Sequence, residues 1–346
     1  MAKAPRMIDV AQAAGVSPMT VSRAFRRDAS VNETTRQRIL AAADALGYVF
    51  DTTASNLRSQ RTGFVAVTIP SLNNANFADT VRALSTGLAQ HDLQILLGYT
   101  NYDMLEEEHL IGQFLRRRPE AIVVSGGKHT DQTRRMLANA RVPVVEIWDL
   151  PDNPIGHVVG FSNAAAMAPL VAHLFNQGYR RIGFIGGDED RDTRGLDRRR
   201  GYVNAMTAQG LDPRRLVASG PPPISMREGA RAMSTLLARY PDIQAVICVS
   251  DLSAFGALTE CQRRGISVPN DIAIAGFGDY EIADIAVPPL TTIDAHASEI
   301  GQQTAAMIVD LLQNKASPSE PRFLDITPTL LVRESTSGSG QVFEPG

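Results

Sequence analysis

The sequence predicts a small all-α head followed by a larger α/β body whose doubly wound parallel sheets form two lobes. The first 50 residues show apolar positions at helical spacing and no strand-like run. After Gly63, short apolar runs alternate with amphipathic stretches, which is typical of parallel strands covered by helices on both faces. These units are too many for one comfortable sheet. The length of 346 residues also fits two or three domains.

The composition is that of an ordinary globular protein. Hydrophobic residues make up 44% and charged residues 21%, so disorder is excluded for most of the length. No run approaches the roughly 18 apolar residues of a membrane span, and the first residues lack the apolar core of a signal peptide. Cys248 and Cys261 are the two cysteines, which excludes a disulfide framework and a Cys-rich zinc site. We therefore expect a cytoplasmic protein that does not enter a membrane.

The charge is distributed unevenly along the chain. Residues 1–62 carry nine Lys and Arg against five Asp and Glu, a balance of +4. Since the whole chain has a net charge of −3, residues 63–346 carry −7. A basic head on an acidic body indicates that the head meets a polyanion.

Three short helices are predicted in the head. Apolar residues at helical spacing in residues 8–14 indicate the first helix, and Gly15 ends it. Ser17, a hydroxyl cap followed by a proline, predicts the start of the second helix. Asn32 is a candidate cap for the third helix, and Gly47 is a candidate end.

A helix, a tight turn and a second short helix form a helix-turn-helix, whose second helix fits the DNA major groove. Arg23 can donate a bidentate pair to guanine, which discriminates by roughly 1–3 kcal/mol. Thr20 and Ser22 suit phosphate oxygens, which position the protein without specifying sequence. The alternative is a three-helix bundle with no role in DNA binding. The candidate DNA-contacting residues of the head are Pro18, Met19, Thr20, Ser22, Arg23, Arg26 and Thr35.

The body divides into two lobes. The first sheet is predicted to end near Gly160 and the second to begin near Ser162. We expect a head at 1–50, a linker at 51–62, a first lobe at 63–160 plus about 291–322, a second lobe at 161–290 plus about 323–336, and a flexible tail at 337–346. The predicted strands are Phe64–Ile69, Leu93–Tyr99, Ala121–Ser125, Val142–Trp148, Arg181–Gly186, Ala245–Ser250 and Ile272–Gly276, and a helix is predicted at Ala297–Asn314.

Several motifs resemble one known family, in that family's order and over nearly the whole chain. The head contains Ile8-Asp9-Val10-Ala11, Thr20-Val21-Ser22-Arg23 and Leu46-Gly47-Tyr48, and the body contains Arg181–Gly187, Gly276–Asp279 and Pro289–Ile293. Together they resemble the lactose/galactose-repressor (LacI/GalR) family. This resemblance implies a helix-turn-helix headpiece, a hinge, and a two-lobed effector domain like the periplasmic sugar-binding proteins. It also implies a homodimer, or a dimer of dimers, on a palindromic double-stranded operator.

Within that family, several stretches resemble the gluconate-repressor branch. They are Ser17–Arg23, Val144–Asp149, Val159–Asn163 and Glu260–Gly265.

The linker carries a second mechanism that the resemblance implies. In relatives, a leucine at the position of Leu57 enters the minor groove at the operator centre as an apolar wedge. Ala54 lies three residues earlier, on the same face of a helix. Asp51 and Ser55 stand where relatives usually carry Asn and Arg, which removes favourable phosphate contacts. The alternative is a flexible tether in which Leu57 docks on the body.

An effector site is expected outside the carboxyl ends of the parallel strands. Arg198 would bind a carboxylate through its guanidinium fork. The alternative is that Arg198 is a solvated helix residue in the arginine run 198–200. Ser250 and Gly278 stand where neutral-sugar relatives carry Asn and Asp, which favours an acidic effector. The candidate effector-binding residues are Ser71, Asn76, Phe77, Tyr99, Lys128, Glu146, Trp148, Phe161, Arg198, Ser250 and Asp279, with Asn101, Ser125 and Asp149 as further polar candidates.

The expected function is therefore a DNA-binding transcriptional repressor without a cofactor. Its expected effector is a small sugar acid such as gluconate or a keto-gluconate, or a phosphorylated relative. The alternative is an α/β sugar-metabolising enzyme with an appended DNA-binding head. Such an enzyme needs a phosphate loop, a dinucleotide fingerprint or an acid/base pair, and Gly183–Gly187 lacks the required spacing. The six histidines show no metal-ligand spacing. A sugar-transport protein is disfavoured by the basic head and the expected absence of a signal peptide.

Overall fold

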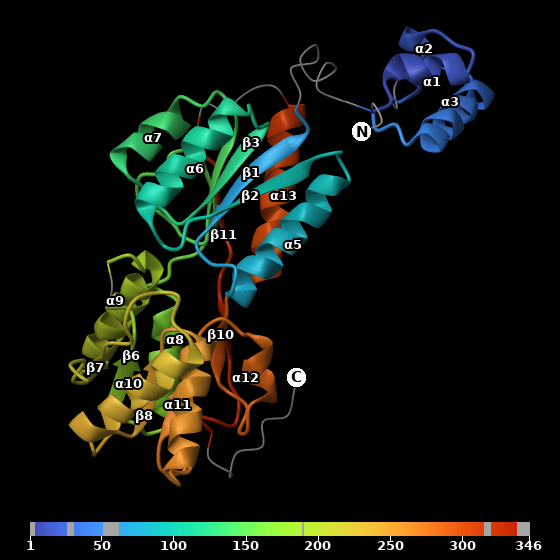
Figure 1. The fold of residues 1–346 in the computed structure, drawn as a ribbon. Coiled ribbons are helices and arrows are strands. Elements are labelled where there is room, and N and C mark those ends of the chain that lie inside the picture. Colours follow the sequence, from blue (N-terminus) through green and yellow to red (C-terminus); the bar gives the residue numbers. More distant parts are fainter. Residues whose placement is uncertain (1–3, 26–30, 51–61, 189, 315–319, 338–346) are drawn as a thin grey trace. The chain divides into compact units, whose positions relative to one another are not determined.

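The computed structural model describes residues 4–25, 31–50, 62–188, 190–314 and 320–337. The chain forms two compact units, Met1–Thr62 and Gly63–Gly346 (Figure 1). The predicted linker and the predicted tail fall almost entirely outside the described residues, as do Arg26 and Leu57. Among the described residues, no helix is long and apolar enough to cross a membrane.

The head contains the three predicted helices, α1 (Met7–Ala13), α2 (Pro18–Ala24) and α3 (Glu33–Leu46). The hydroxyl of Ser17 accepts the backbone N–H of Thr20, and Asn32 caps α3 in the same way. Gly47 ends α3 at φ +63°, a left-handed conformation that favours glycine. The fully buried Val10, Val21 and Ile39 join the helices in one core.

The first lobe is built on a six-stranded parallel sheet with the strand order β11-β5-β4-β3-β1-β2. Alternate residues of its strands enter two cores, so that Val65 and Val67 face the core around α5 and α13, and Ala66 faces α6 and α7. The strands are β1 (Phe64–Ile69), β2 (Gln94–Tyr99), β3 (Ala121–Ser125), β4 (Val144–Ile147), β5 (His157–Gly160) and β11 (Phe323–Asp325), and the helices are α5 (Ala75–Ala89), α6 (Met104–Arg116), α7 (Asp131–Ala138) and α13 (Ala297–Gln313).

The second lobe has a four-stranded parallel sheet with the order β7-β6-β8-β9. Its buried strands pack between helices on both faces, as the continuous apolar runs predicted. Its elements are α8 (Met167–Asn176), β6 (Ile182–Ile185), α9 (Thr193–Ala208), β7 (Leu216–Val217), α10 (Met226–Arg239), β8 (Ala245–Cys248), α11 (Asp251–Arg263), β9 (Ala273–Ala275) and α12 (Glu281–Ile285).

The chain passes between the lobes on a short antiparallel pair, β10 (Thr292–Asp294) with β12 (Thr329–Leu331). Between these two strands it returns to the first lobe, where α13 packs against α5. The predicted lobe boundary at about residue 323 is wrong. Phe323–Asp325 pairs in parallel with β5 and forms the edge of the first sheet, and the chain returns to the second lobe only afterwards. A three-residue edge strand is too short to show a period of its own.

Candidate functional site

The second helix of the head exposes one face and buries the other. Val21 and Ala24 are in the core, while Pro18 and Arg23 are exposed and the side chain of Met19 is 64% exposed. Proline at the first helical position and the Ser17 cap set where this face begins. This exposed face at the start of α2 is the part of a helix-turn-helix that in general contacts base edges.

The other predicted head residues lie around this face. Thr20 shares a hydrogen bond of 2.9 Å with the Ser17 hydroxyl, and Thr20, Ser22 and Thr35 are half-buried. Among the described residues, none forms a hydrogen bond or an ion pair with the Arg23 side chain, so its guanidinium is available to a ligand.

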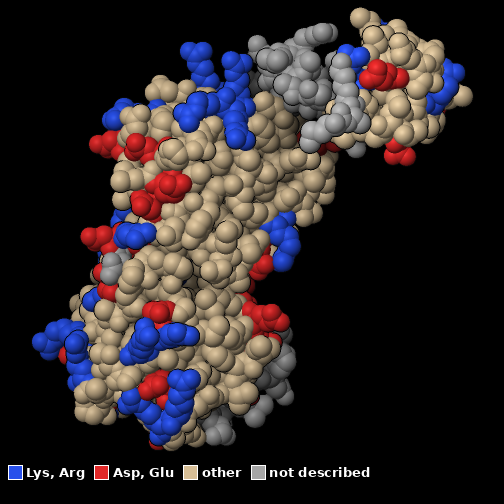
Figure 2. All heavy atoms as spheres, in the orientation of Figure 1, with Lys and Arg blue, Asp and Glu red and all other residues tan. Residues whose placement is uncertain are grey.

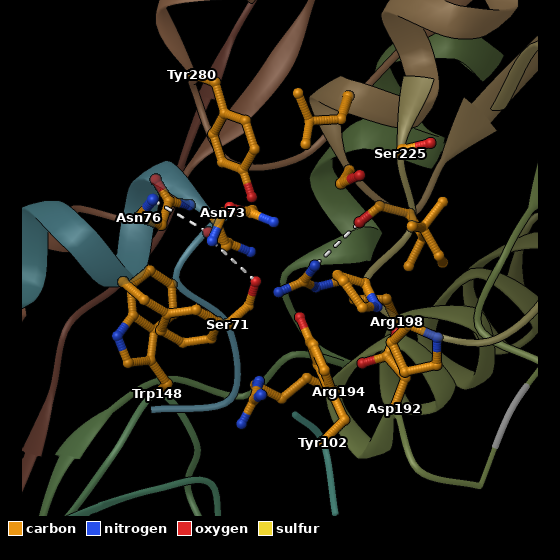
Figure 3. Close-up of a pocket in the computed structure, with 18 residues that line it drawn as sticks. Ser71, Asn73, Asn76, Tyr102, Trp148, Asp192, Arg194, Arg198, Ser225 and Tyr280 are labelled. Carbon is orange, nitrogen blue, oxygen red and sulfur yellow. Dashed lines mark hydrogen bonds between the residues drawn. The ribbon is translucent and has the colours of Figure 1, made fainter. Parts of the chain in front are cut away.

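A pocket of about 140 Å³ lies between the two lobes of the body (Figure 3). The first lobe lines it with residues that follow β1 and β2 and with Trp148 after β4. The second lobe lines it from the start of α9, the β7–α10 loop and the region after β8. The lining residues are Ser71, Asn73, Asn74, Asn76, Phe77, Tyr102, Trp148, Asp192, Arg194, Arg198, Pro222, Pro223, Ile224, Ser225, Val249, Ser250, Leu252 and Tyr280.

An aromatic wall forms the first-lobe side of the pocket. The rings of Phe77 and Trp148 meet edge to face at 5.4 Å, and Trp148 meets Phe161 in the same way at 5.9 Å. The indole N–H donates to the Thr80 hydroxyl at 3.2 Å, which fixes the orientation of the Trp148 ring. Such a wall suits the C–H face of a sugar chain, while polar groups bind its hydroxyls.

Arg198 enters the pocket from α9 and is held in a fixed orientation. Its Nε donates to Asn163 Oδ1 at 3.0 Å, its Nη1 donates to the Val249 carbonyl at 2.9 Å, and its guanidinium stacks 3.7 Å over the Phe277 ring. No described residue accepts a hydrogen bond from Nη2. Burial lowers the pKa of this guanidinium, and Asp192 raises it again. The group stays cationic and presents a free donor edge to an anion.

Polar residues from both lobes complete the pocket. Asp192 caps α9 by accepting the N–H of Gly195 at 3.0 Å. The side chains of Tyr102 and Tyr280 also line the pocket, and burial raises the pKa of both phenols, so they remain neutral. The pocket therefore combines hydroxyl, amide and carboxylate groups, which can bind several hydroxyls of one ligand.

Six of the predicted effector residues line this pocket: Ser71, Asn76, Phe77, Trp148, Arg198 and Ser250. The other five do not. Phe161 packs behind Trp148, the Tyr99 side chain is 41% exposed on the edge strand, Lys128 is exposed, Glu146 is buried beside His129, and Asp279 forms an ion pair with Arg333 at 2.7 Å.

The further candidates Asn101, Ser125 and Asp149 also lie outside the lining.

The sequence prediction missed several lining residues, above all Asp192, Arg194 and Tyr102. One signal was present for Arg194, because it precedes Arg198 by one helical turn and so shares its face of α9. The β7–α10 loop, which supplies Pro222 to Ser225, carries no comparable signal.

Comparison with known proteins identifies both units. Residues 6–51 match the model of bacterial regulatory proteins of the lacI family, and residues 171–336 match that of a periplasmic binding protein-like domain. The chain is 36% identical to the HTH-type transcriptional regulator GntR of Pseudomonas aeruginosa, over 96% of each chain. The chain belongs to the LacI family. Its relatives are transcriptional regulators, so it is a DNA-binding transcriptional regulator and not an enzyme.

Solved structures of LacI-family proteins support this assignment. A LacI-family regulator from Silicibacter pomeroyi matches with a TM-score of 0.87 and 32% identity, covering 96% of this chain and 99% of that one. The regulator GntR from Chromobacterium violaceum matches with a TM-score of 0.73 and 36% identity, covering 80% of this chain and all of that one. Among the residues that the structure describes, no group of His, Cys, Asp and Glu side chains could hold a metal ion.

Proposed function

We propose that this LacI-family regulator is a repressor that binds a palindromic operator as a homodimer. Its affinity for the operator changes, in either direction, when a sugar acid such as gluconate enters the pocket between the lobes. The observation that carries the proposal is Arg198. Its Nε and Nη1 are fixed by protein acceptors while Nη2 is left to the pocket. A fixed guanidinium edge is the group that proteins use to bind a carboxylate.

The rest of the pocket supports a polyol attached to that carboxylate. The edge-to-face pair Phe77 and Trp148 offers an apolar wall, and Asn73, Asp192 and Ser225 offer hydrogen-bonding groups around it. The resemblance of the sequence to the gluconate-repressor branch supports gluconate in particular, and so do the relatives named GntR.

The pocket can control DNA binding because both lobes line it. A ligand that contacts both lobes stabilises the arrangement in which they are close, and such differential binding shifts the equilibrium between two states of the body. Two heads bind a palindrome together only when the two bodies hold them at the matching separation.

Two variants test the proposal with one operator fragment, taken from the DNA upstream of the gene, and with gluconate and glucose as ligands. Wild-type protein should change its operator affinity with gluconate and not with glucose. Arg198→Ala should weaken gluconate binding about ten- to hundredfold in calorimetry and keep operator binding. Arg23→Ala should do the reverse, weakening specific operator binding about tenfold or more. Binding of glucose alone, or an unchanged gluconate response in Arg198→Ala, would overturn the proposal.

A further inference from the structure

Arg194 is a buried cation that the protein itself leaves without an acceptor. The residue is 6% exposed and lies on the first turn of α9. Among the residues that the structure describes, none accepts a hydrogen bond from it or forms an ion pair with it; its guanidinium lies 5.2 Å from the Phe77 ring. A largely buried guanidinium is costly unless acceptors satisfy its N–H groups, so water or a ligand in the pocket must supply them.

The guanidinium faces the pocket between the lobes. Figure 3 shows Arg194 and Arg198 both extending from α9 into the pocket, with Arg194 directed toward the side where Trp148 lies. The first lobe leaves room for it, because a Cβ at Gly126 would come within 2.9 Å of Arg194 Nη1. Gly126 also has φ +96°, a conformation that favours glycine.

The carboxylates near Arg194 do not form an ion pair with its guanidinium. The carboxylate of Asp149 lies near it and accepts the backbone N–H groups of Leu150 at 2.9 Å and Gly127 at 3.3 Å. Burial raises the pKa of Asp149, and Arg194 lowers it again. Asp192 likewise acts on Arg198 by its charge, and neither Asp149 nor Asp192 forms an ion pair with Arg194 or Arg198. The two guanidinium groups repel each other, since Arg194 lowers the pKa of Arg198.

We propose that Arg194 binds a second anionic group of the effector, so that the effector is a sugar acid with two anionic groups, one on Arg198 and one on Arg194. A dicarboxylic sugar acid and a phosphorylated sugar acid share this chemistry. The hydroxyls between the two anionic groups would face Ser71, Asn73 and Asp192 on the pocket wall. This inference rests on the proposed function, because it extends the acid bound by Arg198 with a second charge.

Calorimetry on the full chain tests the inference with three ligands: gluconate, which has one carboxylate, glucarate, which has two, and 6-phosphogluconate, which has a carboxylate and a phosphate. At least one of the two doubly charged ligands should bind wild-type protein about tenfold or more tightly than gluconate, and which one it is identifies the second group. Arg194→Gln should remove this preference, and Arg194→Lys should retain part of it.

Arg200→Gln is the matched control. Arg200 is on the same helix, is exposed and pairs with Asp197 at 3.0 Å, so this variant should keep the wild-type preference. If wild-type protein binds gluconate at least as tightly as both doubly charged ligands, the inference is wrong and the proposed function stands. If none of the three acids binds in an Arg198-dependent way, the proposed function fails with it. Should Arg194→Gln not fold, the wild-type ranking and Arg194→Lys still decide.

Discussion

The side chains of Glu107, His129 and Glu146 form a buried cluster that joins three elements of the first lobe. His129 Nδ1 is 2.7 Å from Glu107 Oε2, and its Nε2 is 3.6 Å from Glu146 Oε1. Glu146 also accepts the backbone N–H of Ile155 at 2.6 Å. Burial lowers the pKa of His129, but the hydrogen bond with Glu107 and the attraction of both glutamates outweigh it and raise the pKa to about 9. The cluster therefore contains an imidazolium at neutral pH.

This cluster should make the stability of the body depend on pH. Because the pKa of His129 is about 9 in the folded chain and 6.5 for an unperturbed histidine, the folded state holds an extra proton between these values. The stabilisation, up to about 3 kcal/mol, is complete below pH 6.5 and is lost as the pH rises through 9. Urea unfolding at pH 7 and pH 10 should show His129→Gln much less stable than wild type at pH 7 and closer to it at pH 10. An equal difference at both values would contradict the prediction.

Strand parity explains which single residues the sequence could place. Val145 and Ile147 on β4 face the core beneath α13, so Glu146 between them faces the opposite side, away from the pocket. Tyr99 ends an edge strand, where one face remains in solvent. Ser71 and Asn76, in contrast, follow the carboxyl end of β1, which has a neighbouring strand on each side, and both line the pocket as expected. Position along a strand is visible in the sequence, but the face toward a lobe interface is not.

At the scale of elements, the contact between α5 and α13 shows how close packing fixes the first lobe. Gly301 on α13 lies against the backbone of α5, and a Cβ there would overlap the carbonyl oxygen of Thr80. The Thr80 hydroxyl donates to the Ala297 carbonyl at 2.9 Å, and the same hydroxyl accepts the Trp148 indole N–H. The packing of two helices is therefore linked to the aromatic wall of the pocket.

We expect Gly301→Ala to destabilise the body by about 1–3 kcal/mol, because helix α13 must move away from α5 to admit the methyl group. Gly112→Ala on α6 is the matched control. Its nearest heavy atoms, on Arg116 and Met136, lie 3.9 Å from the added Cβ, so the better helix propensity of alanine should stabilise by up to about 1 kcal/mol. Urea unfolding measures both. Equal stability of Gly301→Ala and wild type would show that the two helices can separate without cost.

The long apolar strands and capped helices could be predicted from the sequence, whereas the short elements could not. The predicted runs at Phe64–Ile69 and Ala121–Ser125 are strands over the same residues. The short β5 was not predicted, although it is wholly buried. Two-residue β7 and three-residue β11 are defined by pairing with neighbours distant in the chain rather than by a local period.

At the scale of the whole molecule, the chain crossings join the lobes of the body, and Arg191 adds a polar contact at the pocket rim. Arg191, which follows β6 in the second lobe, donates to the carbonyl of Asn101 at 2.7 Å and to that of Tyr102 at 3.4 Å in the first lobe. Both acceptor residues have positive φ angles, +50° and +57°, which turn the loop after β2. Tyr102 itself lines the pocket, so the contact joins the lobes beside the ligand site.

Removing this contact should favour separation of the lobes. Arg191→Ala loses two hydrogen bonds between them, worth about 0.5–1.5 kcal/mol each, so the closed state should become less populated and the affinity for an effector should fall several-fold. Small-angle scattering of the ligand-free variant should give a larger radius of gyration than wild type, and calorimetry with gluconate should give a weaker affinity. Arg200→Ala, which loses an ion pair within α9, should change neither quantity. If Arg191→Ala keeps the wild-type radius and affinity, the Arg191 contact does not set the separation of the lobes that the effector requires.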